Sequence, residues 1–319
     1  MGPASPAGLG TSERPLHEVY DAALLDLDGV LYVGPDPVPH AAASIAAARD
    51  AGMRAAFVTN NASRRPAAVA EHLTALGIPA DPDDVVTSAQ AAVRYLVARL
   101  PAGSRILVVG TDGLAEEVEA AGLRPVRDAA GALAVVQGLS TATTWEDLAE
   151  AAVAIRAGAL WVAGNRDATY PSARGPVPGN GAFVAALETA TGATPVVVGK
   201  PQPELHMASV ERVGARRPLV VGDRLDTDVL GARATGTDCL LVLTGVTELD
   251  ELLAAPPESR PTFVGWDLRA LLVPHPPVSL AGDGAACGEG RAVRAGAHLD
   301  LQGPQDLALR AACGLAWSG

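Results

Sequence analysis

A short apolar segment that ends in two aspartates constrains the fold of this chain more than any other feature. Residues 22–25 read AALL and are followed by Asp26, Leu27, Asp28 and Gly29. An apolar run of this length that ends in acidic residues and glycine predicts a buried parallel strand whose carboxyl end opens into a loop. Open α/β sheets bind their ligands at this edge.

The two carboxylates indicate a metal site. Asp26 and Asp28 are one residue apart, and like charges this close resist ionising together unless a cation lies between them. A divalent metal would supply that charge. An ordinary Asp-Gly turn after a strand explains the same residues, so the choice depends on the rest of the chain.

Composition limits the class of ligand. The chain has 319 residues, of which 49% are hydrophobic, and this is enough to bury the cores of two domains. Its net charge of −12 disfavours nucleic acids and anionic membranes, which require basic surfaces. No apolar run approaches the roughly 18 to 20 residues of a membrane span. We therefore expect a small anionic ligand that is met by local charges or by a metal, with no nucleic-acid or membrane partner.

The cysteines and the N-terminal residues bear on the compartment. Three cysteines, an odd number without the spacing of a zinc site, favour a reduced cytoplasmic setting. Residues 1–16 are rich in Gly, Pro and Ser and lack the basic and apolar regions of a secretory signal. We predict that they form a disordered leader.

Predicted strands and helices alternate at short spacing along the chain. This pattern is typical of α/β proteins with a doubly wound, Rossmann-like parallel sheet. A second α/β set over 88–179 is complete enough to fold by itself as an inserted domain. We therefore expect a discontinuous core of 17–87 and 180–262 around the insertion, with an extension of uncertain structure over 263–319 in which only 304–315 is typical of a helix.

Polar residues follow four predicted core strands, namely Asp26 with Asp28, Thr59 with Asn60, Lys200, and Asp223 with Asp228. Successive parallel strands end at one edge of the sheet, so these groups can converge. Asp26 can act as a nucleophile, Thr59 as a hydroxyl donor, Lys200 as a fixed positive charge, and the aspartates as oxygen ligands of Mg²⁺. Phosphoryl transfer requires little more.

Lys200 is the only lysine in the sequence. A compact ammonium suits a site where a point charge must touch both a carboxylate and a phosphate, although chance retention explains it as well. Asp223 and Asp228 likewise fit an exposed loop followed by a helix N-cap.

Four motifs in order carry a resemblance: DLDGVLYVG, FVTNN, VVGKPQPELH and VVGDRLDTDVLGA. Residues 19–245 resemble the haloacid dehalogenase superfamily of aspartyl phosphatases with a cap domain between the second and third motifs. The GKPQP and GDRLDTD forms resemble its subgroup of p-nitrophenyl phosphatase-like, phosphoglycolate and pyridoxal phosphate phosphatases. Within that subgroup the composition and the C-terminal extension are most similar to actinobacterial glycerol-3-phosphate phosphatases.

The resemblance implies a role for each motif residue. Asp26 would attack phosphorus and bind Mg²⁺. Asp28 would protonate the leaving oxygen, then activate water, and its backbone carbonyl would bind the metal. Thr59 and the Asn60 backbone would bind the phosphoryl group, and Lys200 would bridge it to Asp26. Asp223 would be the second metal carboxylate, with Asp228 behind it, orienting Lys200 or a metal-bound water.

The segment NRDATY over 165–170 resembles the family's cap loop that touches the leaving group. Arg166 and Asp167 supply a donor and an acceptor beside little bulk, which favours glycerol 3-phosphate, although a surface turn fits as well. Phosphoglycolate is the main rival because Arg166 could pair with its carboxylate. Pyridoxal 5′-phosphate and broad activity on p-nitrophenyl phosphate remain alternatives.

Two non-catalytic classes compete with a phosphatase. A phosphoacceptor receiver domain also combines acids, Thr and Lys at strand ends, but it lacks a long insertion and a Gly-Asp strand end after the lysine. A binding protein that uses the cap for partners is the other class. Among enzymes, a mutase would need a second phosphate pocket that is not evident. A homodimer through the cap is a further hypothesis.

Overall fold

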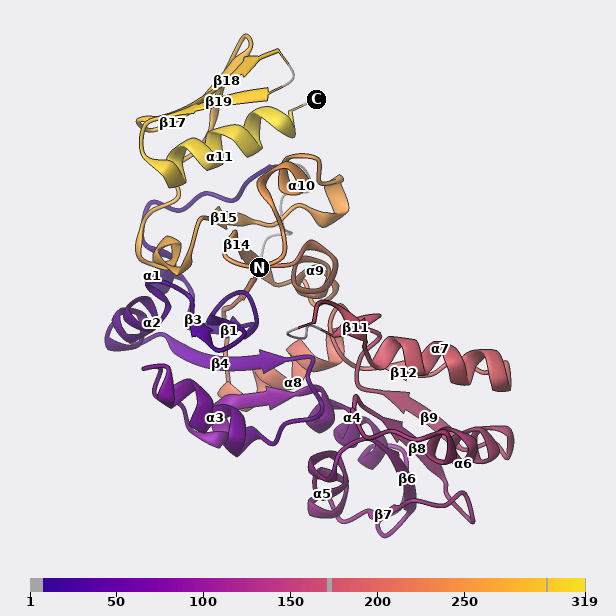
Figure 1. Ribbon diagram of the computed structural model, residues 1–319. Helices are drawn as coiled ribbons and strands as arrows, with labels where there is room; N and C mark the ends of the chain where they lie inside the picture. Colours follow the sequence, from indigo (N-terminus) through magenta and orange to yellow (C-terminus); the bar gives the residue numbers. More distant parts are fainter. Residues whose placement is uncertain (1–7, 171–173, 297, 319) are drawn as a thin grey trace. The chain divides into compact units, whose positions relative to one another are not determined.

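The computed structural model describes residues 8–170, 174–296 and 298–318, and the chain divides into two compact units (Figure 1). The first unit comprises Met1–Val58, His72–Ala80 and Ser209–Gly319, and the second comprises Thr59–Glu71 and Asp81–Ala208. Each unit is built on parallel strands with helices between them, which confirms the predicted α/β class.

The first unit contains neighbouring strands of one parallel sheet, in the order β15 (Phe263–Gly265), β14 (Asp238–Val242), β13 (Pro218–Gly222), β1 (Ala22–Leu25) and β4 (Arg54–Thr59). All four residues of β1 are buried, as expected for a central parallel strand. Its register pairs Leu24 with Val220 of β13 and with Ala56 of β4. The predicted strand at 22–25 is therefore an interior strand of this sheet, with a parallel partner on each side.

The first unit includes the helices α1 (Leu16–Val19), α2 (Ala41–Asp50), α9 (Leu230–Ala234) and α10 (Leu249–Leu253), and a further helix near its C-terminal end. The division between the units falls within α3 (Pro66–Ala75) and α8 (Pro203–Val213). A hairpin of β2 (Tyr32–Val33) and β3 (Asp36–Pro37) follows the loop after β1. Across the described part of the chain, no helix has both the length and the apolar character needed to cross a membrane.

The second unit has its own parallel sheet, in the order β12 (Val196–Val197), β9 (Leu160–Ala163), β8 (Ala134–Gln137), β6 (Arg105–Val109) and β7 (Arg124–Val126). It also contains β5 (Val85–Thr87), the hairpin of β10 (Thr169–Tyr170) and β11 (Val177–Pro178), and the helices α4 (Ser88–Val97), α5 (Asp112–Ala120), α6 (Trp145–Arg156) and α7 (Asn180–Thr191).

The structure differs from the sequence-based boundary at residue 180. The sequence placed α7 and β12 in the core, but β12 pairs with β9 through Val196 and Val162. Val184 and Leu187 of α7 pack in the same apolar cluster as Trp161. A short apolar strand carries no local mark of the sheet that it joins, so the pattern alone misplaced both elements.

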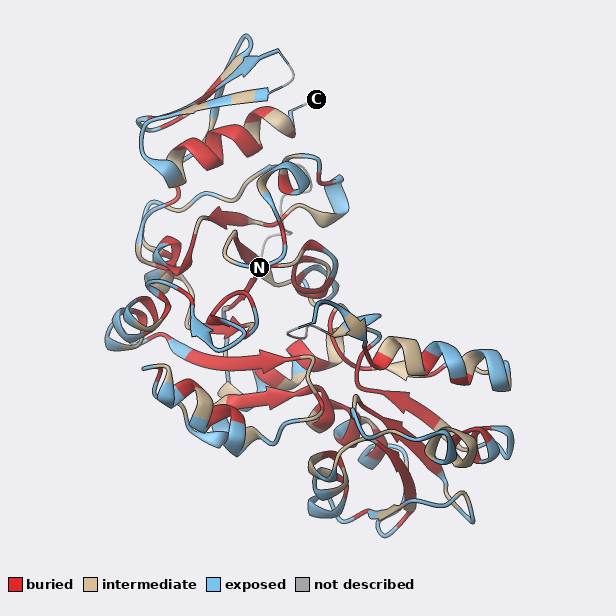
Figure 2. Cartoon of the chain, viewed as in Figure 1, coloured by how far each residue is buried: buried red, intermediate tan, exposed pale blue. Residues whose placement is uncertain are grey.

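The C-terminal extension is folded, whereas its structure was left uncertain from sequence. After β15, which belongs to the core sheet, β16 (Ser279–Ala281), β17 (Gly284–Cys287), β18 (Gly290–Ala295) and β19 (His298–Gln302) form an antiparallel sheet. The helix α11 (Gln305–Ala316) packs on this sheet, and Figure 2 shows how much of it is buried. The helix predicted over 304–315 is confirmed, and the strands before it were missed.

The predicted disordered leader is corrected in part. Residues 1–7 lie outside the described residues. The Gly10 amide donates to the Thr262 carbonyl at 2.7 Å, and Leu16 is fully buried. Ser12 pairs with His275 in an antiparallel bridge. These contacts order the chain from Gly10 onward, because the C-terminal extension, whose structure was unknown from sequence, provides the surface that binds it.

Candidate active site

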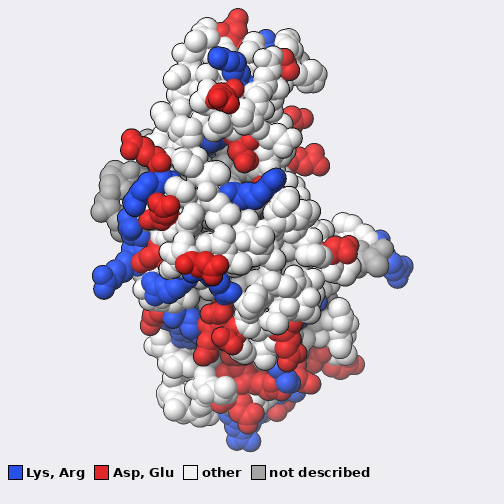
Figure 3. Space-filling view, turned by 90° about the vertical axis from the view of Figure 1, so that its left-hand side faces the viewer, with Lys and Arg blue, Asp and Glu red and all other residues white. Residues whose placement is uncertain are grey.

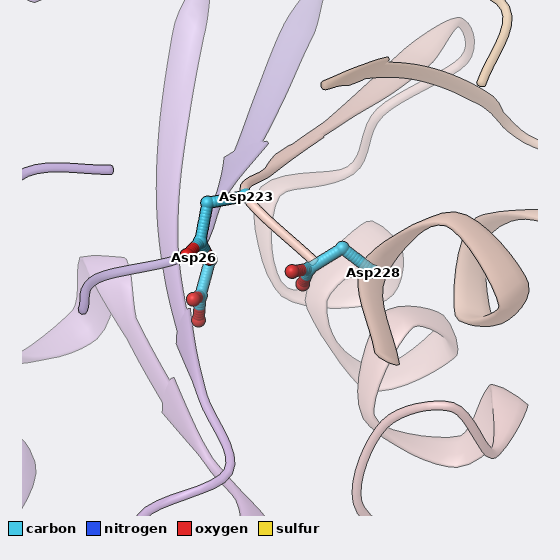
Figure 4. A group of neighbouring side chains, drawn as sticks. All are labelled: Asp26, Asp223 and Asp228. Atoms are coloured by element: carbon cyan, nitrogen blue, oxygen red, sulfur yellow. The ribbon is translucent and has the colours of Figure 1, made fainter. Parts of the chain in front are cut away.

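Three aspartates from separate segments of the first unit come together. Asp26 follows β1, Asp223 follows β13, and Asp228 lies in the π-helical turn η2 (Leu225–Val229). One carboxylate oxygen from each lies within 4.8 Å of the others, and Figure 4 shows the three side chains near one another. Asp223 and Asp228 are buried, and Asp26 is half-buried.

The register of β1 and β13 places the first two carboxylates. Leu25 pairs with Val221, and the Asp26 amide donates to the Val221 carbonyl at 2.8 Å. Both strands then end at the same edge of the sheet. Asp26 is the residue after Leu25, and Asp223 is the second residue after Val221. Convergence at a parallel strand edge, which the sequence predicts, is thus observed for this pair.

Glycines form a close-fitting cradle around Asp223. A Cβ atom at Gly29 would lie 2.2 Å from Asp223 Oδ2, and one at Gly245 would lie 2.0 Å from it. Gly29 also has a φ of +85°, which side-chain-bearing residues rarely adopt. The Val246 amide donates to the same oxygen at 2.6 Å. These contacts hold the carboxylate in one position.

The segment 244–246 was missed in the sequence analysis. Besides the Val246 amide at Asp223, the Thr244 hydroxyl donates to the Gly29 carbonyl at 2.6 Å, so the segment braces the loop after β1 as well. It follows β14 directly. The strand-end rule that identified the four predicted groups would have identified this one too, because β14 is also a parallel strand of the core.

Asp228 faces the cluster rather than capping a helix. It lies inside η2, and the residue that precedes α9 is Val229. A Cβ atom at Gly222 would lie 2.2 Å from Asp228 Cγ, so this carboxylate packs closely against the end of β13. The Arg224 amide donates to Asp228 Oδ2 at 3.2 Å. The N-cap interpretation of Asp228 is therefore not supported, and π-helical turns of this kind are frequent at functional sites.

The cluster fits a hard divalent cation. Carboxylates gathered this closely and largely buried carry an unfavourable repulsion that a cation relieves. An all-oxygen set of ligands is what Mg²⁺ and Ca²⁺ prefer. Asp28 is not among the clustered carboxylates, and its side chain is exposed. Its part in a metal site would accordingly be through its backbone, as the resemblance implies.

The second unit holds the other predicted phosphoryl-binding residues. Thr59 and Lys200 are each 4% exposed. Asn60 Oδ1 accepts a hydrogen bond from the Lys200 amide at 2.7 Å, and Asn60 Nδ2 donates to the Lys200 carbonyl at 3.1 Å. Asn60 and Lys200, which are 140 residues apart in sequence, are thus brought together, although β12, the strand before Lys200, belongs to the second sheet and not to the core sheet as predicted.

The loop after β9 has a fixed backbone and an exposed arginine. Arg166 pairs with Glu188 of α7 at 2.6 Å. The Asp167 amide donates to Asn165 Oδ1 at 3.1 Å, and the Asp167 carbonyl accepts from the Gly181 amide at 2.9 Å. Arg166 is therefore bound to a carboxylate of its own unit, a contact that the sequence did not reveal.

Charged side chains cover the molecular surface unevenly. On the face shown in Figure 3, acidic side chains gather toward the lower end of the view, with basic ones interspersed. This distribution agrees with the net charge of −12.

Comparison with known proteins shows a consistent relationship. Two family models match, one for haloacid dehalogenase-like hydrolases over residues 23–124 and one for HAD-like hydrolases over 197–271. A D-glycerol 3-phosphate phosphatase of Mycobacterium tuberculosis is 53% identical over 259 residues, covering 81% of this chain and 72% of that protein. An acid sugar phosphatase of Staphylococcus aureus is 36% identical over 235 residues, covering 73% of this chain and 90% of that protein.

Solved structures extend the similarity to most of the chain. The magnesium complex of the glycerol phosphate phosphatase from M. tuberculosis has a TM-score of 0.84 and 46% identity, covering 95% of this chain and 92% of that one. A p-nitrophenyl phosphatase of Archaeoglobus fulgidus has a TM-score of 0.74 and 30% identity, covering 79% of this chain and 98% of that one. With this identity and coverage, the chain belongs to the family of haloacid dehalogenase-like hydrolases.

Proposed function

We propose that this protein is a Mg²⁺-dependent phosphomonoesterase that hydrolyses glycerol 3-phosphate through an aspartyl-phosphate intermediate. The observation that carries the proposal is the convergence within 4.8 Å of Asp26 and Asp223, at the ends of β1 and β13, with Asp228 of η2. Family membership and the names of the relatives support the phosphatase class.

The metal would be held by Asp26, Asp223 and the backbone carbonyl of Asp28, with the Asp228 carboxylate beside those of Asp26 and Asp223. When bound, Mg²⁺ would offset the negative charge of the phosphoryl oxygens and of the aspartates. The magnesium complex of the M. tuberculosis relative supports the choice of metal. The cradle of Gly29 and Gly245 supports a ligand role for Asp223, since it fixes the orientation of that carboxylate.

The reaction would use residues of this chain in two steps. A carboxylate oxygen of Asp26 forms a bond to phosphorus while the bond to the leaving oxygen breaks, and Asp28 gives that oxygen its proton. Asp28 then accepts a proton from the water that attacks phosphorus, and this attack releases Asp26 and inorganic phosphate. Thr59, the Asn60 backbone and Lys200 would bind the phosphoryl oxygens throughout. These roles are assigned from the motifs.

The ion pair between Arg166 and Glu188 favours a polyol over an acidic substrate. Its guanidinium is paired with Glu188, so a carboxylate such as that of phosphoglycolate would have to compete with an existing partner. A neutral hydroxylated leaving group does not have to displace the Glu188 carboxylate from Arg166. The relative from M. tuberculosis is named for glycerol 3-phosphate, whose leaving group is a polyol.

Steady-state kinetics of the purified protein test the proposal. We expect hydrolysis of glycerol 3-phosphate that depends on added Mg²⁺ and stops with EDTA. Its kcat/KM should exceed that for phosphoglycolate and pyridoxal 5′-phosphate. A tenfold preference for either rival would refute the substrate, while inactivity on all phosphomonoesters, including p-nitrophenyl phosphate, would refute the phosphatase.

Compartment and assembly are separate proposals. A cytoplasmic location is supported by the three cysteines, which are all buried and form no disulfide. A homodimer through the cap domain predicted over 88–179 remains a prediction from sequence. Light scattering of the purified protein, with and without Mg²⁺, would measure the oligomeric state directly.

A further inference from the structure

The side chain of Asn60 fixes the backbone of Lys200. Its amide group accepts from the Lys200 N–H at 2.7 Å and donates to the Lys200 carbonyl at 3.1 Å, so both backbone polar groups of the lysine are bound by one side chain. The close approach of the Asn60 side chain to the Lys200 backbone requires glycine at position 199, since a Cβ atom at Gly199 would lie 2.7 Å from Asn60 Oδ1. Asn60 therefore determines where the lysine side chain begins.

The backbone of Asn60 is itself held by two buried side chains. Its carbonyl accepts a hydrogen bond from Asn165 Nδ2 at 2.7 Å and another from Ser88 Oγ at 2.6 Å. Ser88 is fully buried, and Asn165 is 5% exposed. Both lone pairs of this carbonyl are thus used by side chains from elements far from Asn60 in sequence.

Asn165 connects the Asn60 carbonyl to the loop of Arg166 and Asp167. Its Oδ1 accepts from the Asp167 amide at 3.1 Å, and its own carbonyl accepts from Asn180 Nδ2 at 2.8 Å. Asn180 is the first residue of α7 and is 1% exposed. One buried amide therefore binds Asn60 with its nitrogen and the loop of Arg166 and Asp167 with its oxygen.

We propose that Asn165 is a positioning residue that acts on Lys200 through Asn60, and that it couples the loop of Arg166 and Asp167 to the group that holds the phosphoryl oxygens. The inference rests on the proposed function. A neutral amide is required because the position needs a donor toward Asn60 and an acceptor toward Asp167 at once. A carboxylate supplies only acceptors, and an alanine supplies neither.

The kinetic signature follows from where Lys200 acts. The charge on the transferring oxygens is common to every phosphomonoester, so a displaced Lys200 lowers kcat equally for glycerol 3-phosphate and for p-nitrophenyl phosphate. Loss of leaving-group contacts would instead affect glycerol 3-phosphate alone. For Asn165→Ala we expect kcat to fall about 10- to 100-fold with both substrates, as for other residues that orient a reacting group.

The matched control is Ser104→Ala. Ser104 is buried in the same unit, and its hydroxyl donates to the Pro101 carbonyl at 2.6 Å, outside the contacts of Asn165. This variant should keep kcat within about twofold of the wild type at a similar loss of Tm. Equal kcat values for the Asn165 and Ser104 variants would overturn the positioning role, as would a loss confined to glycerol 3-phosphate.

A second variant keeps the test valid if Asn165→Ala fails to fold. Asn165→Asp is isosteric and retains the acceptor toward Asp167, but its second oxygen faces the Asn60 carbonyl. Protonation of the introduced carboxyl restores a donor, so the activity of Asn165→Asp relative to wild type should rise as the pH is lowered from 8 to 5. A ratio that is independent of pH would contradict the inference.

Phosphate binding separates this inference from the proposed function. The wild-type protein with Mg²⁺ should bind inorganic phosphate by calorimetry, and Asn165→Ala should bind it about tenfold more weakly, whereas Ser104→Ala should not differ from wild type. A wild type that hydrolyses no phosphomonoester would refute the proposed function, and unchanged phosphate binding in Asn165→Ala would refute the positioning role alone.

Discussion

Gly245 lies so close to Asp223 that a Cβ atom on it would come within 2.0 Å of the carboxylate oxygen Oδ2. The neighbouring amide of Val246 donates to that same oxygen at 2.6 Å. Any side chain at position 245 must therefore displace either the carboxylate or the segment that holds it. The position of Asp223, a proposed metal ligand, thus depends on the absence of a side chain at Gly245.

Gly245→Ala should weaken the metal site more than the fold. We expect the Mg²⁺ concentration for half-maximal activity to rise about 10- to 100-fold, because the substitution moves a ligand, together with an overpacking cost of about 1–3 kcal/mol in stability. Mg²⁺ titrations by activity and by calorimetry would measure the first effect. Gly8→Ala is the control, since a Cβ atom there meets nothing within 4 Å. An unchanged Mg²⁺ requirement would show that Asp223 is not a ligand.

Asp26→Asn should abolish turnover and leave the protein folded. An amide cannot form the acyl phosphate, and the substitution also removes one negative charge from the cluster. The control is Asp226→Asn, in the same turn η2 as Asp228, because Asp226 pairs with Arg224 and lies outside the clustered carboxylates. Substantial Mg²⁺-dependent activity in folded Asp26→Asn would refute Asp26 as the nucleophile.

Asp28→Asn should slow the reaction by about 10²- to 10⁴-fold, the usual loss of a general acid and base. The nucleophile is intact in this variant, and only proton transfer is lost. The deficit should be smaller for p-nitrophenyl phosphate, whose leaving group scarcely needs a proton. Single-turnover rates with both substrates would compare the leaving-group step, and equal deficits would contradict the acid role.

The positions of Asp26, Thr59 and Asp223 could be predicted because each depends on a local pattern. The apolar runs before Asp26, Thr59 and Asp223 form the strands β1, β4 and β13, and parallel strands end at a common edge. Asp228 was predicted to lie behind the metal ligands, and the structure places its carboxylate among those of Asp26 and Asp223. A π-helical turn, which sequence periodicity does not reveal, explains this placement.

Other features depend on contacts that no local pattern encodes. The strands β17 and β18 consist largely of Gly, Ala and Arg instead of the β-branched and aromatic residues that favour strands, and β17 and β18 pack on α11. The membership of β12 in the second sheet depends on its pairing with β9. Asn165 is one polar residue within a predicted loop, and its importance is evident only when its contact with Asn60 is seen.

The pairing of Arg166 with Glu188 gives a prediction on substrate choice. For glycerol 3-phosphate, Arg166→Ala and Asp167→Ala should each lower kcat/KM, because a polyol uses both a donor and an acceptor. For phosphoglycolate, only Arg166→Ala should matter. Glu188→Gln removes the competing carboxylate at 2.6 Å and should raise kcat/KM for phosphoglycolate relative to glycerol 3-phosphate. No change in this ratio would mean that Arg166 does not face the leaving group.

His275 should make stability depend on pH. Its Nε2 donates to the Ala270 carbonyl at 2.8 Å, and its Nδ1 accepts from the buried Arg310 at 3.1 Å, so the folded protein holds the ring neutral. Burial, with a smaller effect of the Arg310 charge, lowers the pKa of His275 to about 4.

Because that pKa lies below the ordinary value of about 6.5, the unfolded chain binds the proton more readily between these values. The free energy of unfolding should therefore fall as the pH drops from about 6.5 to 4, by up to about 3 kcal/mol for this group. Urea unfolding across this range should show a shallower pH dependence in His275→Gln than in wild type. His298→Gln, at an exposed position, should keep the wild-type dependence. Parallel curves for wild type and His275→Gln would mean that the imidazole is not held neutral by the fold.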